Sequence, residues 1–63
     1  MVELSRLNGD IIFINSDLIK YVESRPDTLV TFVDGKTLVV KEAPQEVARR
    51  VREVKKGRVV EAL

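Results

Sequence analysis

Hydrophobic and polar positions at the start of the chain predict a β-hairpin. Residues Val2–Leu7 alternate between apolar and polar side chains, which indicates a strand with one buried face. Residues Ile11–Ile14 are apolar at every position, and this is typical of a strand that is covered on both faces. Asn8-Gly9 lies between the two segments and predicts a type I′ turn. In so small a protein, the second cover of Ile11–Ile14 has to come from the helix or from another subunit.

The stretch Arg25–Glu42 carries the strongest hairpin signal in the sequence. Two runs rich in β-branched residues, Thr28–Val33 and Lys36–Lys41, are joined by Asp34-Gly35. A type I′ turn requires positive φ at both central residues, and Asp-Gly adopts such angles at low steric cost. This stretch is therefore predicted to supply the fourth and fifth strands.

The remaining segments predict a short turn, a third strand and a helix. Ser16–Ile19 is expected to form one helical turn, and the alternation of Lys20–Ser24 predicts a strand. Pro44 fits the first turn of a helix, because its missing N–H costs nothing there. The helix is predicted to run to Lys56 and to stop at Gly57. Its apolar stripe consists of Val47, Val51 and Val54.

These elements predict a mainly β fold with one α-helix. The five strands are expected to form an antiparallel meander, either a twisted sheet or an open small barrel, followed by the C-terminal helix. One domain is predicted over residues 1–57, with a short tail over residues 58–63. The predicted buried positions are Leu4, Ile11, Phe13, Val22, Val30, Phe32, Leu38, Val40, Val47, Val51 and Val54.

The composition argues against several classes of protein. The chain has no cysteine and no histidine, so disulfides and the usual zinc sites are excluded. The aspartates are spread one to a turn, and no nucleophile has a candidate base beside it, so we expect no enzymatic activity and no cofactor. A chain of this length builds only a marginal core. Because disulfide and metal are absent, self-association is the stabilising device that is left, and we expect a homo-oligomer.

The basic residues are concentrated in the C-terminal third. The net charge is +1, but residues 43–63 contain six basic and three acidic side chains. The helix cations are predicted to form either a solvated outer face or a docking surface for an acidic partner or an anionic membrane. The low net charge and the few aromatic residues argue against a nucleic-acid partner. A small β-barrel regulator that binds RNA is kept as the alternative to a protein-binding function.

Neither the length of the apolar runs nor the N-terminus indicates a membrane or secreted protein. No apolar run approaches the ~20 residues that a transmembrane helix needs. The first ten residues lack the apolar core of a secretory signal. A cytoplasmic location is therefore expected.

Several short motifs occur in a characteristic order: RLNG at 6–9, IN at 14–15, LI at 18–19, PDT at 26–28, DGK at 34–36, VVKE at 39–42 and EV at 46–47. This order resembles the small flagellar FlbD family, also called swarming-motility SwrD, over residues 2 to 56. The resemblance implies a non-catalytic bacterial protein that acts in swarming and in the power of the flagellar motor. It also implies contact with stator units, at the cytoplasmic face of the motor.

Ten positions match the pattern of this family: Arg6, Asn8, Gly9, Asn15, Glu23, Pro26, Asp27, Thr28, Gly35 and Glu42. Turn geometry explains the glycines and the proline, and Asn15 is expected to cap the short helical turn. The family tends to carry a small polar residue where this chain has Ala43, so we expect a weaker helix cap. Surface salt bridges, worth ~0–1 kcal/mol each, are the alternative role for the charged matches. The candidate protein-binding residues are Arg6, Glu23, Asp27, Glu42, Arg49, Arg50, Arg52 and Lys56.

Overall fold

The computed structural model describes the backbone of residues 1–62 and the side chains of residues 1–56. It confirms the predicted class, a mainly β fold with one C-terminal helix. The elements are β1 (Val2–Ser5), β2 (Ile11–Ile14), the 3-10 turn η1 (Ser16–Leu18), β3 (Ile19–Ser24), β4 (Thr28–Phe32), β5 (Thr37–Val40) and α1 (Pro44–Ala62). The predicted cap of η1 is confirmed, because the Asn15 side chain accepts a hydrogen bond from the Asp17 N–H at 3.0 Å.

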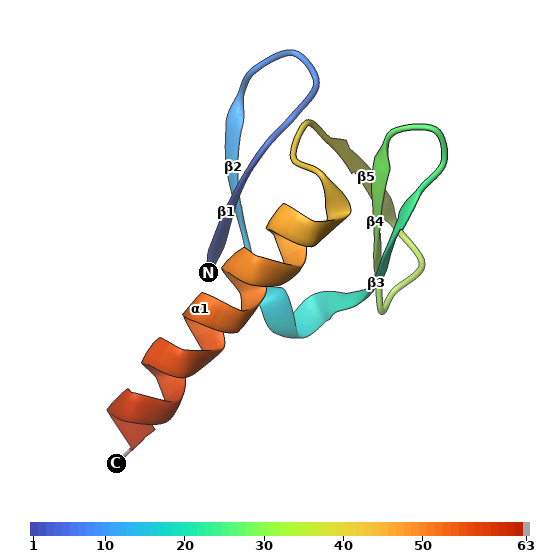
Figure 1. Ribbon diagram of the computed structural model, residues 1–63. Helices are drawn as coiled ribbons and strands as arrows, with labels where there is room; N and C mark the ends of the chain where they lie inside the picture. The colour runs from blue at the N-terminus through green and yellow to red at the C-terminus, as the bar shows by residue number, and fades with distance from the viewer. Residues whose placement is uncertain (63) are drawn as a thin grey trace.

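The five strands are antiparallel to their neighbours and divide into two sheets. One sheet pairs β1 with β2, and the other has the order β3-β4-β5, with a register shift between Ile19 and Tyr21. The two sheets meet where β1 and β5 end, through an isolated bridge between Arg6 and Val40. The Lys41 N–H also donates to the Ser5 carbonyl at 2.9 Å. The two sheets do not close into a barrel. The helix α1 packs against both β1 and β3 (Figure 1).

Two hairpin loops have the same geometry, and it differs from the predicted type I′ turn. The Gly9 N–H donates to the Arg6 carbonyl, and the Gly35 N–H donates to the Phe32 carbonyl, each at 2.9 Å. Only the glycines have positive φ, 96° at Gly9 and 91° at Gly35, whereas type I′ needs two such residues. Each loop therefore has three residues and ends in a glycine bulge. The type I′ prediction was wrong because Asn-Gly and Asp-Gly serve both loop types.

The hydrophobic core lies between the two sheets and α1. Its buried members are Val2, Leu4, Ile14, Val30, Val40 and Val47. The other predicted positions on β3, β4, β5 and α1 are partly buried and pack against them. The predictions for Ile11 and Phe13 were wrong, since these side chains are 54% and 61% exposed. Successive strand residues point to opposite faces, so only Ile12 and Ile14 of β2 face the core. The second face of β2 is uncovered in the single chain.

The helix starts as predicted and continues further than predicted. The Ala43 carbonyl accepts hydrogen bonds from the Glu46 and Val47 N–H groups, at 2.9 and 3.0 Å, so Ala43 caps the helix through its backbone alone. Gly57 does not end α1, which runs on to Ala62. A glycine in a helix interior costs about 1 kcal/mol relative to alanine, which weakens a helix without breaking it. The boundary predicted between residues 57 and 58 therefore falls inside α1.

Replacement of Gly35 tests the loop geometry. A Cβ atom at this position would meet no heavy atom within 4 Å, so a substitution changes only the backbone energy. Gly35→Ala should lower the free energy of unfolding by about 1–2 kcal/mol, because alanine resists positive φ. Gly35→Asn should lose less, because asparagine tolerates this conformation. Urea denaturation measures both, and equal losses would contradict the assigned loop.

Candidate protein-binding surface

Four charged side chains at the start of α1 form one ion-pair network, the charge clamp: Glu42, Glu46, Arg49 and Arg50. Glu46 is the hub, because its Oε2 accepts from Arg49 Nη2 at 2.6 Å and from Arg50 Nε at 2.7 Å. Arg49 Nε adds a third bond to Glu46 Oε1 at 3.0 Å. These pairs are spaced three and four residues apart, so one helical face brings them together.

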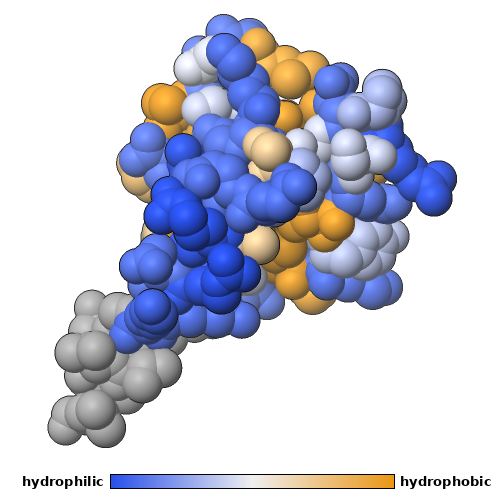
Figure 2. Space-filling model, in the orientation of Figure 1, coloured by the Kyte–Doolittle hydropathy of each residue, from blue (hydrophilic) through white to orange (hydrophobic). Residues whose placement is uncertain are grey.

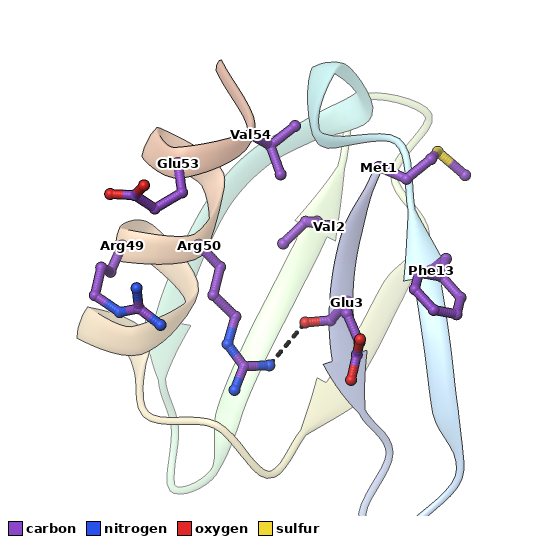
Figure 3. Close-up of a pocket in the computed structure, with 8 residues that line it drawn as sticks. All are labelled: Met1, Val2, Glu3, Phe13, Arg49, Arg50, Glu53 and Val54. Atoms are coloured by element: carbon purple, nitrogen blue, oxygen red, sulfur yellow. Dashed lines mark hydrogen bonds between the residues drawn. The ribbon is translucent and has the colours of Figure 1, made fainter. Parts of the chain in front are cut away.

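The charge clamp reaches across to the edge of β1 that does not pair with β2. The carboxylate of Glu42 accepts the Ser5 N–H at 2.9 Å, and its other oxygen lies 3.3 Å from Arg50 Nη1. The same Arg50 nitrogen donates to the Glu3 carbonyl at 2.8 Å (Figure 3). Arg50 therefore turns back onto β1, although the sequence pattern placed the helix cations on an outer face or a docking surface. Two of the candidate binding residues, Glu42 and Arg50, hold the fold together.

The environment of Glu42 favours its ionised form. The side chain is only 10% exposed, and this burial on its own would raise the pKa of the carboxyl group. The hydrogen bond from the Ser5 N–H and the positive charge of Arg50 outweigh the burial, so the pKa lies below its ordinary value of 4.5. Glu42 is therefore an anion at neutral pH, held between the Ser5 N–H and Arg50.

Glu46 is an even stronger acid. Hydrogen bonds from Arg49 and then from Arg50 lower the pKa of its carboxyl group to about 2. Its charge raises the pKa of both guanidinium groups in return. The clamp thus neutralises part of the basic surface that the sequence predicted, because Glu46 engages two of its cations.

The other candidate residues are spread over the molecule. Glu23 pairs with Arg25 at 3.0 Å next to the β3–β4 loop, and the Asp27 carbonyl closes that loop by accepting the Arg25 N–H at 2.8 Å. Arg52 forms no ion pair with any of the residues 1–56, and Lys56 approaches Glu53 only to 4.0 Å. The structure therefore brings Glu42, Arg49 and Arg50 together, leaves Arg52 and Lys56 further along α1, and places Glu23 and Asp27 beside the β3–β4 loop.

The exposed side of α1 stays basic despite the charge clamp. Figure 2 shows hydrophilic side chains over the visible side of the helix, with hydrophobic atoms exposed beside it. Residues 44–56 contain five cations and two carboxylates, a difference of +3. Arg52, Lys55 and Lys56 are all exposed and lie outside the clamp. These three side chains are the part of the predicted basic surface that lies outside the clamp, and among the described residues only Lys56 of the three has an ion-pair partner, Glu53.

A groove of about 500 Å³ lies beside the clamp, between α1 and the β1–β2 hairpin (Figure 3). Arg49, Arg50 and Glu53 line it from the helix, and Met1 and Phe13 line it from the hairpin. Met1 and Phe13 are 66% and 61% exposed. The groove therefore combines apolar and charged walls. The sequence pattern placed Phe13 in the core, so the hairpin side of the groove was not predicted.

A second hollow of about 330 Å³ opens on a more apolar surface. Leu18, Phe32 and Val33 contribute to its lining, and Arg6 and Lys36 bring positive charge to it. Leu18 and Val33 are about half exposed although both are large apolar residues. Sequence reasoning selected Arg6 but not its apolar neighbours. Leu18 lies in a turn and Val33 in a loop, where polar residues are usual. Large apolar residues at such positions were the signal that could have indicated this hollow.

Neither a cluster of metal ligands nor a membrane-spanning helix is found among the described residues. No group of three or more aspartate and glutamate side chains converges within the described part of the chain as metal ligands would. In the same residues, no helix has a long enough apolar stretch to cross a bilayer.

The fold and these surfaces define a small β-rich domain with a clamped helix and two open hollows. The chain belongs to the FlbD family of flagellar and swarming motility proteins, whose family model matches residues 1–59. This membership confirms the resemblance that the order of the short motifs indicated. No curated protein matches the chain, and no solved structure matches it.

Removal of Arg50 should destabilise the fold more than removal of Arg49. Both side chains bind Glu46, but only Arg50 also bonds the Glu3 carbonyl and Glu42. Arg50→Ala should therefore cost about 1–2 kcal/mol more, because hydrogen bonds to charged groups are worth about 1.5–3 kcal/mol. Arg49→Ala is the matched control, since an exposed ion pair contributes only ~0–1 kcal/mol. Chemical denaturation of both variants checks the difference, and equal losses would remove Arg50 from the structural role.

Acid should weaken the fold through the clamp carboxylates. Both have a lower pKa in the folded chain than in the unfolded chain, so the native state binds fewer protons. Their stabilisation is present above the ordinary value of 4.5 and is lost as the pH falls, for Glu46 down to about 2. Glu42→Gln keeps an acceptor for the Ser5 N–H but cannot titrate. Its melting temperature should fall less steeply with decreasing pH than that of the wild type, and parallel curves would contradict the assignment.

Proposed function

We propose that this protein is a non-enzymatic accessory of the bacterial flagellum that supports motor power by protein–protein contact. Membership of a family described as flagellar and swarming motility proteins carries the broad role. The finer proposal is a contact with a motor or stator component from the cytoplasmic side. It is supported by the exposed helix cations, because such charges complement acidic segments of a partner.

The exposed cations outside the clamp are the contact that we favour. Arg52 and Lys56 are exposed, and they lie beyond the ion pairs that hold α1 to β1. Their positive charge is therefore available to a partner without any cost to the fold. The part of Arg49 that remains exposed, 55% of its side chain, borders the same surface.

RNA binding, the alternative from the sequence, receives less support. Sheet-based RNA binders stack bases on neighbouring aromatic side chains. Here Phe13 lies on β2, whereas Tyr21 and Phe32 lie on the other sheet, and Phe32 is half-buried. The exposed aromatics do not share a sheet, so we retain the contact with a protein.

A charge-reversal pair tests the proposed surface. Arg52→Glu combined with Lys56→Glu should reduce motor torque and swarming in cells while filament number stays normal. Lys20→Glu combined with Lys41→Glu changes the net charge equally on exposed strand-side positions and should leave torque unchanged. Matching melting curves show that the variants fold. Normal torque in the first pair would remove α1 from the mechanism, and loss of filaments on deletion of the whole gene would replace motor support by an assembly role.

A further inference from the structure

The free edge of β2 carries unpaired backbone groups. In the β1–β2 ladder the Arg6 N–H donates to the Asp10 carbonyl, and the residues of an antiparallel pair alternate between bonded and non-bonded positions. The N–H and C=O groups of Ile11 and Phe13 therefore point away from β1. The same alternation turns Glu3 and Ser5 outward on β1, where the clamp binds them. On β2 no described strand or charged side chain takes the corresponding place.

The side chains of β2 also lack the usual protection of an edge strand. Ile11 and Phe13 lie on one face and are 54% and 61% exposed. The strand Ile11–Ile14 contains no charge and no proline, the two devices that commonly prevent an edge from pairing with another chain. The open edge and the exposed apolar face thus coincide on the same four residues.

We propose that two copies of this chain pair through β2 in an antiparallel arrangement, with Ile12 on the twofold axis. In this register Ile11 lies opposite Phe13 of the second copy, and Phe13 lies opposite its Ile11. All edge-directed N–H and C=O groups of these residues then find partners, which a shift by two residues in either direction does not achieve. The two hairpins then form one four-stranded sheet. This pairing does not rest on the proposed flagellar role.

A second copy fits this edge because the strand is self-complementary. Isologous pairing places the same surface on both sides of the interface. Asp10 falls opposite Ile14 of the second copy, so the twofold axis does not bring two like charges face to face. The exposed Ile11 and Phe13 side chains of both copies gather into one apolar cluster on the outer face. The second cover that the all-apolar sequence of β2 calls for is thereby supplied in part.

Light scattering of the full chain tests the dimer. The wild type should show twice the chain mass of 7.1 kDa at micromolar concentration. Phe13→Lys places a charge in the proposed cluster and should return the mass to that of one chain, with an unchanged circular dichroism spectrum. Val33→Lys replaces another exposed apolar residue, at 59% exposure, and should stay dimeric. A wild type that is monomeric even at millimolar concentration, or a dimeric Phe13→Lys variant, would overturn the proposal.

Disulfide trapping tests the register. The chain has no cysteine, so each single variant introduces one thiol only. On the twofold axis the two Ile12 positions form a non-bonded pair with Cα atoms about 4.5 Å apart, within the range of a disulfide. Ile12→Cys should therefore oxidise to a covalent dimer, whereas Leu7→Cys, exposed in the β1–β2 loop, should remain monomeric on a denaturing gel. Equal cross-linking of both variants, or none at Ile12→Cys, would exclude this pairing.

Discussion

The fold depends on how the second edge of β1 is satisfied. One edge of this strand pairs with β2, but no strand runs along the other, which lies beneath the start of α1. A backbone group that is withdrawn from water without a partner costs free energy comparable to a lost hydrogen bond, and the Ser5 N–H on this edge is part-buried. Glu42 binds the Ser5 N–H and Arg50 binds the Glu3 carbonyl, so two charged side chains take the place of part of a missing strand. The edge is closed, and the helix is fixed to the hairpin by the same contacts.

This arrangement divides the charges of α1 between structure and surface. Glu46 holds Arg49 and Arg50 in place, and its low pKa, about 2, follows from these two partners. The cations one turn further along, Arg52 and Lys56, have no part in that network. The boundary between the two sets lies within a few residues of one helix. Mutations that treat the helix cations as one patch would therefore mix an effect on folding with an effect on binding.

The sequence pattern predicted the elements well and the long-range contacts poorly. Pro44 marked the start of α1, and the uninterrupted apolar run marked β2, because these signals are local. The clamp joins residues 37 and 47 positions apart, and no periodicity reveals which glutamate meets which strand. Phe13 was placed in the core because a strand that is apolar on both faces normally has two covers. The family was identifiable because the order of the short motifs can be recognised in the sequence without any knowledge of contacts.

The two edges of the β1–β2 hairpin are treated in opposite ways. The β1 edge is closed by charges and by the Lys41 N–H bond to Ser5, so it cannot accept another strand. The β2 edge, with Ile11 and Phe13, has neither charges nor a covering segment in the described part of the chain. The core of a chain this small is marginal, so apolar surface that stays in water is costly to it. The difference between the edges thus gives the hairpin one side for its own fold and one side that is free for pairing.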